Sequence, residues 1–195
     1  MRACGESKKC HKISHFSTFH FRLYNLWMNL VRPSLEYQKS YIEALQEFLN
    51  ESLHKEAIEF EIEHFAEVVA HMDDAEQGKN LRTNEVPRSE FWLTDSQRYL
   101  GKIQIRHKPK GRTPDIASHI YYEVRPSERG RGYGTQLLRE GLKEAKKIGL
   151  HDVIITCDKD NFSSKKIIEA NGGKFIEEIF MQDSDNSILK YHIFL

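Results

Sequence analysis

The sequence predicts a layered fold of mixed α/β (α+β) class, in which a central, mostly antiparallel sheet carries helices on both faces. Three observations support this prediction. Two amphipathic helical patterns come first, short apolar strands follow them, and the second half alternates strand, helix, strand, helix and two more strands. We expect the strand–helix–strand unit 118–157 to be a right-handed parallel crossover within one sheet.

The first two helices are read from the spacing of their apolar residues. The first should begin after Ser34, a common N-cap residue, with Glu36 in its first turn. The second carries apolar residues at spacings of 4, 3, 4 and 3 from Ile58 to Met72. Acidic residues fill the outer faces, which indicates solvated helices rather than a metal or protein site.

The middle of the chain carries strand signals. Segments 91–93 and 99–106 flank the turn-like residues 94–96, so we expect a hairpin. Segment 108–115 contains two prolines and a glycine and is expected to be a loop, followed by a strand at 118–124.

Helical and strand patterns alternate in the rest of the chain. A helical stripe reaches Ile148, and Gly149 stands where a C-terminal stop belongs. The remaining expected elements are a buried strand at 153–157, a short helix at 162–170, and strands at 175–181 and 188–194 around a turn at 183–186.

Length and composition suit one domain with an extension. The chain has 195 residues, and residues 1–27 are first basic and then aromatic. Polar residues interrupt any apolar centre there, which argues against a signal peptide. We expect 1–27 to lie outside the conserved fold and 28–195 to form a single domain. An organellar transit peptide or a partner-docking arm is the alternative for the extension.

Charge and cysteine content exclude several classes of protein. The net charge is zero, although residues 1–32 carry +5, 33–95 carry −10 and 96–195 carry +5. A whole-molecule basic field for nucleic acid is therefore absent, and no apolar run is long enough to span a membrane. Cys4, Cys10 and Cys157 match no zinc spacing, so we expect no metal and a reducing, cytoplasmic setting.

The most informative segment is the glycine-rich turn at 124–135, which joins a strand to a helix. Glycines at 130, 132 and 134 allow sharp bending and close approach of a ligand. The first turn of a helix offers unpaired N–H groups and partial positive charge, so this is an anion cradle suited to phosphate. Arg125, Arg129 and Arg131 add charge around it.

Three phosphate ligands compete for this turn. A nucleoside triphosphate loop needs Gly-Lys-Ser/Thr, whereas this turn has Gly134-Thr135-Gln136. A dinucleotide turn needs G-x-G-x-x-G, whereas these glycines stand at every second position. The pyrophosphate of coenzyme A is the third.

The turn resembles a family signature. Arg129-x-x-Gly132-x-Gly134 matches the Arg/Gln-x-x-Gly-x-Gly/Ala pattern of the GNAT N-acetyltransferases, above all uncharacterised bacterial-type members. The order of elements from 118 to 177 is also similar. The resemblance covers roughly 29–195. It implies that the strands ending near Val124 and Cys157 splay apart in a V, with the pantetheine of acetyl-CoA between them.

The resemblance also implies a set of cofactor contacts. Backbone N–H groups of 130–135 would hold the pyrophosphate, and Asn161 would contact the cofactor arm while also serving as N-cap of its helix. The implied cofactor-binding residues are Val124, Arg125, Arg129, Gly130, Arg131, Gly132, Tyr133, Gly134, Thr135, Asn161 and Ser164.

The implied chemistry is direct attack of a primary amine on the acetyl thioester in a ternary complex. Glu123 and His119 share one face of the strand before the turn and are the candidate bases. The family's usual proton-donating tyrosine falls at Ile168, which cannot donate. Tyr121, Tyr122, Tyr191 and Cys157 remain as candidate proton donors, or the thiolate leaves unassisted.

The partners follow from this reading. The expected acceptor is a small or amino-acid-like amine, with no nucleic acid or membrane partner, and a homodimer is possible. The alternative to an acetyltransferase is a catalytically silent CoA-binding module, suggested by Ile168. A nucleic-acid binder using Arg129 and Arg131 would need stacking aromatics beside them, and only Tyr133 fits.

Overall fold

A computed structural model describes residues 28–51, 55–181 and 186–195, and the predicted extension 1–27 lies outside them. The strands are β1 (Met28–Val31), β2 (Arg88–Asp95), β3 (Arg98–Lys110), β4 (Ser118–Val124), β5 (Asp152–Asp158), β6 (Lys174–Phe180) and β7 (Ser187–Phe194). The α-helices are α2 (Gln38–Leu49), α3 (Lys55–Glu63), α4 (Phe65–Glu76), α5 (Tyr133–Lys147) and α6 (Phe162–Ala170), and two 3₁₀ turns are η2 (Leu35–Tyr37) and η3 (Pro126–Glu128). The fold is therefore of α+β class.

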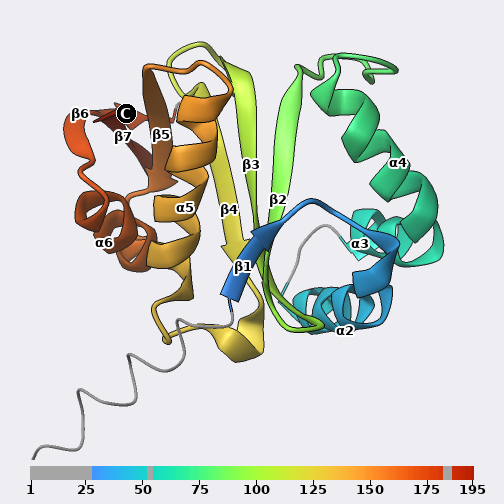
Figure 1. The fold of residues 1–195 in the computed structure, drawn as a ribbon. Coiled ribbons are helices and arrows are strands. Elements are labelled where there is room, and N and C mark those ends of the chain that lie inside the picture. Colours follow the sequence, from blue (N-terminus) through green and yellow to red (C-terminus); the bar gives the residue numbers. More distant parts are fainter. Residues whose placement is uncertain (1–27, 52–54, 182–185) are drawn as a thin grey trace, which may run out of the picture.

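The strands form two antiparallel sheets, β1-β2-β3-β4 and β5-β7-β6. Helices α2, α3 and α4 cover one face of the larger sheet, and α5 lies on the other, beside α6 and the smaller sheet (Figure 1). No described helix has the length and apolar character that a membrane crossing requires.

The two sheets meet where β4 and β5 begin. The Ser118 hydroxyl donates to the Ile154 carbonyl at 3.3 Å, and the Ile154 N–H donates to His119 Nδ1 at 2.9 Å. Side-chain hydrogen bonds from β4, rather than a ladder of backbone hydrogen bonds, thus join β4 to β5. We expected one sheet containing a parallel β4–β5 pair, but the described residues place the two strands in separate sheets.

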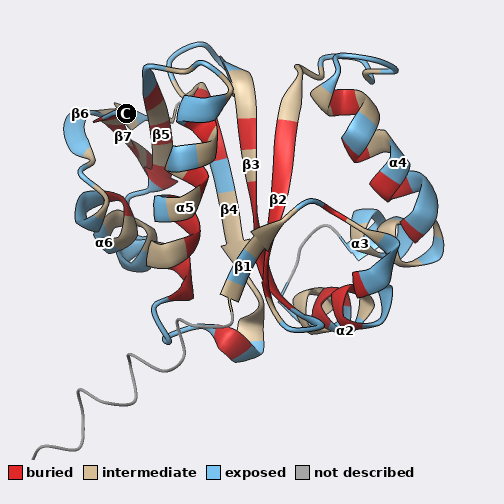
Figure 2. Cartoon of the chain, viewed as in Figure 1, coloured by how far each residue is buried: buried red, intermediate tan, exposed pale blue. Residues whose placement is uncertain are grey.

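Two hydrophobic clusters lie on opposite faces of the larger sheet. One joins β2–β4 to α5 and to β5 and β7, and the other joins β2 and β3 to α2 and α4. In the second cluster the rings of Tyr41 and Trp92 stack with centroids 4.5 Å apart. Because both faces are covered, most of β2 is buried (Figure 2).

Most of the expected elements are present. Ser34 accepts from the Glu36 N–H as an N-cap, 118–124 is a strand, and Gly149 ends α5 with φ +92°. The helix at 162–170 and the last two strands also form, while most of the expected turn at 183–186 lies outside the described residues.

Three further details of the fold differ from the predictions. The apolar stripe from Ile58 to Met72 is two helices, because the backbone leaves helical geometry at His64, where φ is −115°. Strand β3 runs on to Lys110 and so includes Pro109, which we placed in a loop. Strand β1 was not predicted, since four residues of one edge strand carry little pattern.

Candidate active site

A cavity of about 610 Å³ lies where β4 runs into the glycine turn, between that strand and the first turns of α5 and α6. Strand β4 pairs with β3 along one edge only, so its other edge is free to face the cavity. The cavity brings together most of the predicted cofactor residues: Val124, Arg129, Gly130, Gly132, Tyr133, Gly134, Thr135, Asn161 and Ser164.

The glycine turn points the start of α5 at this cavity. Gly130 has φ +78° and Gly132 has φ +83°, a left-handed conformation that favours glycine. Gly132 is the N-cap residue and provides no side chain to cap the helix. The N–H groups of the next three residues have no partner one turn earlier in the helix, so they are available to an anion.

The three arginines around the turn lie in different places. Arg129 lines the cavity, donates from Nε to the Val124 carbonyl at 3.2 Å and pairs with Glu51 at 2.7 Å. Arg131 lies outside the cavity lining and pairs with Glu128 at 2.8 Å. The structure thus places one of the three beside the candidate phosphate position.

Arg125 also lies outside the cavity lining and fastens the turn to helix α2. Its guanidinium donates to Glu47 at 2.7 Å, and the Ser127 N–H donates to the same carboxylate at 3.0 Å. Burial alone would raise the pKa of Glu47, but these hydrogen bonds and the Arg125 charge lower it below its ordinary value. Arg125 therefore has a structural partner in place of a phosphate.

The first turn of α6 forms the opposite wall. Asn161 Oδ1 accepts from the Ser164 N–H at 2.9 Å and caps the helix. Ser164 Oγ lies 2.7 Å from the Tyr122 hydroxyl, which links α6 to β4. Burial raises the pKa of Tyr122 to about 12, although the hydrogen bond with Ser164 opposes this shift. Tyr122 therefore stays protonated at neutral pH.

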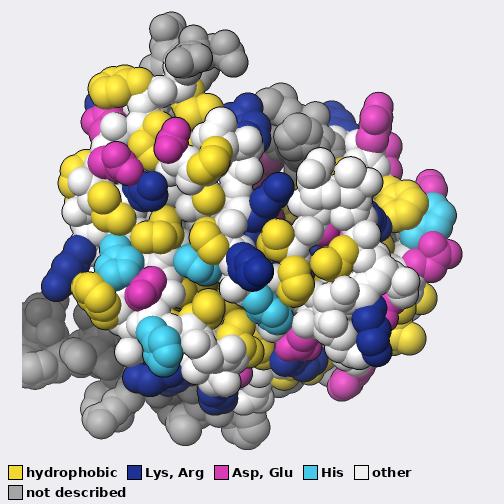
Figure 3. Space-filling view, turned by 90° about the horizontal axis from the view of Figure 1, so that it is seen from above, with side chains coloured by type: hydrophobic (Ala, Val, Ile, Leu, Met, Phe, Trp, Pro, Cys, Tyr) yellow, Lys and Arg dark blue, Asp and Glu magenta, His cyan; other side chains and the backbone are white. Residues whose placement is uncertain are grey.

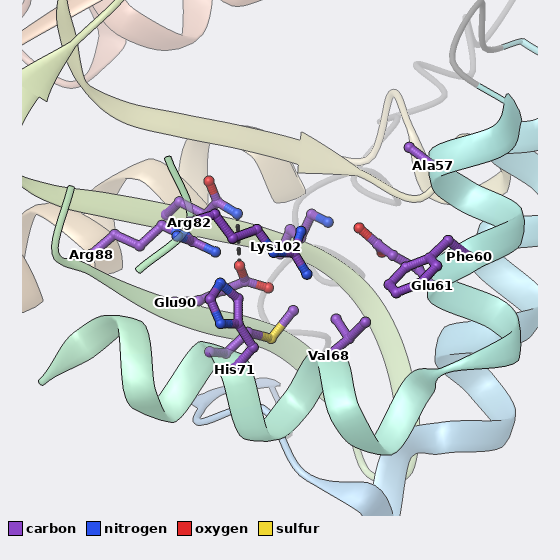
Figure 4. Close-up of a pocket in the computed structure, with 11 residues that line it drawn as sticks. Ala57, Phe60, Glu61, Val68, His71, Arg82, Arg88, Glu90 and Lys102 are labelled. Carbon is purple, nitrogen blue, oxygen red and sulfur yellow. Dashed lines mark hydrogen bonds between the residues drawn. The ribbon is translucent and has the colours of Figure 1, made fainter. Parts of the chain in front are cut away.

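Glu123 lines this cavity and contacts a residue that lines a second cavity. Its carboxylate pairs with Lys102 Nζ at 3.2 Å and accepts from the Tyr121 hydroxyl at 2.6 Å. Lys102 lines a cavity of about 380 Å³ between β2, β3 and helices α3 and α4 (Figure 4). The Lys102–Glu123 ion pair therefore joins the two cavities.

Lys102 is a buried cation in the middle of strand β3. Burial alone would lower its pKa, but the neighbouring Tyr41, Glu123 and Glu90 raise it well above the ordinary value. Sequence reasoning missed Lys102. Its signal was the one charged residue in the strand segment 99–105, where a buried lysine needs a partner.

His119, the second candidate base, lies away from the cavity lining, at the opposite end of β4 from Val124. Its Nδ1 accepts from the Ile154 N–H, and the side chain is buried. Burial lowers the pKa of His119, so the ring stays neutral. Its position makes it a link between the sheets.

The other candidate proton donors lie outside the cavity lining. Ile168, which stands at the position of the family's proton-donating tyrosine, is fully buried in the core. The Tyr191 hydroxyl lies 3.5 Å from Glu169, and Cys157 is a buried free thiol whose pKa is raised by burial. Among the tyrosines named as candidate proton donors, only Tyr122 lines the cavity. No group of three His, Cys, Asp or Glu in the described segments could hold a metal ion.

One family model matches the chain. A sequence model described as the acetyltransferase (GNAT) family matches residues 42–172. No curated protein matches the sequence.

Solved structures share the fold at low identity. RimL, a ribosomal L7/L12 alpha-N-protein acetyltransferase solved with coenzyme A, has a TM-score of 0.65 at 14% identity, over 88% of this chain and 96% of its own. The microcin C7 self-immunity acetyltransferase MccE, solved with acetyl-CoA and AMP, has 0.64 at 14%, over 88% and 94%. Mycobacterium smegmatis RimJ, solved with a CoA disulfide, has 0.66 at 14%, over 86% and 81%.

The family model covers the whole glycine turn, both walls of the cavity and the helices behind the second cavity, and the solved structures repeat the arrangement of strands and helices. The chain belongs to the acetyltransferase (GNAT) family, whose members are acetyl-CoA-dependent N-acetyltransferases.

Proposed function

We propose that this protein transfers an acetyl group from acetyl-CoA to the primary amine of a small acceptor, by direct attack in a ternary complex. The observation that carries the proposal is the 610 Å³ cavity, whose lining includes both the open N-terminus of α5 and Glu123. One end suits a pyrophosphate, and the other presents a carboxylate to an amine.

The cofactor follows the free edge of β4. Its pyrophosphate accepts from the N–H groups of residues 130–135, and Arg129 adds a positive charge by exchanging Glu51 for phosphate. The pantetheine arm lies in the V between β4 and β5. Near the start of the two strands, Ser118 and His119 of β4 bond to Ile154 of β5. A backbone N–H near Val124 polarises the thioester carbonyl.

Glu123 is the proposed base. It reaches both cavities, through its own place in the first and through Lys102 in the second. An ammonium entering from the second cavity passes its proton to Glu123, directly or through one water molecule, and the neutral amine attacks the carbonyl carbon. Holding both substrates side by side supplies much of the rate.

Tyr122 is the proposed acid. When the tetrahedral intermediate collapses, the carbon–sulfur bond breaks and the thiolate of coenzyme A takes the hydroxyl proton of Tyr122. Ser164, 2.7 Å from that hydroxyl, holds it toward the cavity wall and can stabilise the tyrosinate until solvent reprotonates it. In this proposal Tyr122 on β4 is the proton donor, a role that the family pattern assigns to a tyrosine at the position of Ile168.

A reducing, cytoplasmic setting and the lack of a nucleic-acid partner remain part of this proposal. Cys157 is a free thiol, which supports the first. On the face seen in Figure 3, basic and acidic side chains are interspersed and form no broad basic surface, which supports the second. Whether the protein dimerises is open to measurement by sedimentation.

Release of free coenzyme A, measured with a thiol reagent, tests the proposed function. The protein with acetyl-CoA and a mixed panel of primary amines should release thiol, and mass spectrometry should find an acceptor heavier by one acetyl group. Binding of acetyl-CoA without turnover of any amine would instead favour the silent CoA-binding module.

A further inference from the structure

The second cavity is where an acceptor would lie, and its lining limits the acceptor's chemistry. It is bounded by α3, α4, β2 and β3, and its volume of about 380 Å³ is near the small end of the roughly 300–1,000 Å³ usual for ligand sites. In Figure 4, Arg82 and Arg88 enter from one side and Glu61 from the other, with Lys102 and Glu90 between them. This inference rests on the proposed function.

Two of the charged groups in the lining are already neutralised. Lys102 pairs with Glu123 at 3.2 Å. Arg88 pairs with Glu85 at 2.9 Å. Glu85 also accepts from the Arg82 backbone N–H at 2.8 Å and lies 3.0 Å from His71 Nε2. A charged ligand therefore gains little from Lys102 or Arg88.

Two carboxylates in the lining have no cation bonded to them within the described segments. Glu90 is only 2% exposed, and its hydrogen bonds come from neutral donors, Trp92 Nε1 at 3.0 Å and Gln104 Nε2 at 2.8 Å. Glu61 accepts from the Tyr41 hydroxyl at 2.9 Å through one oxygen. Two anions facing one small cavity favour an ammonium ligand.

One cation in the lining also lacks a partner. Arg82 lines the cavity and is exposed, and its guanidinium makes no hydrogen bond or ion pair to any residue that the structure describes. The backbone N–H of Arg82 donates to Glu85, and this hydrogen bond holds the backbone from which the side chain extends. A guanidinium of this kind binds a carboxylate through two parallel hydrogen bonds.

We propose that the second cavity selects acceptors carrying both a primary amine and a carboxylate, as in a free amino acid. The ammonium group lies between Glu61 and Glu90 at the end nearest Lys102, from which it reaches Glu123. The carboxylate pairs with Arg82. Phe60, Val68 and Met72 line the same cavity and contact the aliphatic or aromatic part of the acceptor.

The charges discriminate against three other amine classes. A polyamine would bring a second cation toward Arg82 and Arg88. A simple monoamine would leave Arg82 without a partner and so lose one charge-assisted hydrogen-bond pair. A peptide with a blocked carboxyl terminus would lose the same contact.

Specificity constants for matched acceptors test the proposal. Leucine is compared with leucinamide and isoamylamine, and phenylalanine with phenylalaninamide, all with saturating acetyl-CoA. The carboxylate form should be preferred, and Arg82→Gln should reduce the carboxylate-to-amide ratio of kcat/KM by about tenfold. Because amidation itself lowers the pKa of the amine, the ratio is compared between proteins.

Arg112→Gln is the matched control, since Arg112 is an exposed arginine in the loop between β3 and β4. It should leave the ratio unchanged. An equal ratio in wild type and Arg82→Gln would overturn the proposal, as would turnover of polyamines or amides alone. Lack of turnover with every member of the series, in a protein that binds acetyl-CoA by calorimetry, would overturn it too. Failure to bind acetyl-CoA would instead count against the proposed function.

Discussion

At the residue scale, the proposed mechanism depends on two neighbouring residues of β4 with different roles. Glu123 lines the first cavity and pairs with Lys102, which lines the second, while Tyr122 bonds to Ser164 on α6. Successive residues of a strand point to opposite faces, so in the proposed mechanism one side chain of β4 acts on the acceptor and the next acts on the leaving group.

Glu123→Gln should lower kcat by about 100-fold or more, because the amide cannot accept a proton. Acetyl-CoA affinity should stay within about twofold, since Glu123 does not hold the phosphates. Steady-state kinetics with calorimetry provides both readouts. Glu177→Gln, on the exposed strand β6, is the control. Full activity of Glu123→Gln would show that another group takes the proton.

Tyr122→Phe should lower kcat by about 10- to 100-fold with little change in KM, because only the leaving-group step loses its proton donor. It should also cost about 1 kcal/mol of stability through the lost bond to Ser164. Tyr191→Phe removes a tyrosine hydroxyl outside the cavity lining and should retain activity. The reverse pattern, with Tyr191 essential and Tyr122 dispensable, would refute the assignment.

At the element scale, helix α5 carries both the phosphate end of the site and a close contact with the sheet. Gly141 faces Ile103 of β3, and an added Cβ would meet its Cδ1 and lie 3.2 Å from Cγ1. Ile103 is fully buried, so it has no free space to move into. Glycine at 141 therefore lets the helix lie close to β3.

Gly141→Ala should destabilise the fold by about 1–3 kcal/mol from overpacking, a cost that the better helix propensity of alanine reduces by about 1 kcal/mol. Ile103→Val removes the Cδ1 atom, so the double variant should be more stable than the sum of the two single changes predicts. Urea denaturation measures all four proteins. Strict additivity of the two changes would show that the contact is not strained.

The sequence was most informative at this scale. Helix α5, strand β4 and helix α6 appear close to their predicted bounds, because Gly132 and Gly149 mark both ends of α5 and Asn161 caps α6. Helices α3 and α4 were merged, since the stripe from Ile58 to Met72 keeps its spacing across the break at His64. The spacing of apolar residues indicates which face of a helix is buried, but it does not indicate a change in helix direction.

At the scale of the whole molecule, the two sheets are joined by side chains, which strand patterns cannot reveal. The sequence predicted that Ser118 and His119 lie in a strand. It could not predict their hydrogen bonds to Ile154, because β5 lies more than thirty residues away in the chain. The same holds for the second cavity, because Lys102, Glu61 and Arg82 come from separate elements. The glycine turn was predictable because its residues are contiguous in the chain.

His119 makes the link between the sheets pH-dependent. Burial lowers its pKa from the ordinary value of about 6.5, so the folded state favours the neutral ring. The unfolded chain binds the proton first, and stability falls as the pH drops from about 7 toward 5. His119→Gln keeps an acceptor for the Ile154 N–H and should reduce this slope.

His107 has a pKa lowered by burial as well, so it contributes in the same direction and part of the slope should remain in His119→Gln. Chemical denaturation at several pH values provides the measurement. An unchanged slope in His119→Gln would mean that His119 is already protonated in the folded protein or that its pKa is equal in both states.

The central claim is that the start of α5 holds the pyrophosphate of acetyl-CoA, and calorimetric titration tests it most directly. Gly132→Asp places a carboxylate at the N-terminus of α5, and Gly149→Asp places one at its other end, where φ is also positive. Acetyl-CoA should bind the wild type and Gly149→Asp with similar, micromolar-range affinity, while NADPH and ATP give no comparable heat. Gly132→Asp should lose binding while remaining folded. Equal binding to all three proteins, or none to the folded wild type, would contradict the account.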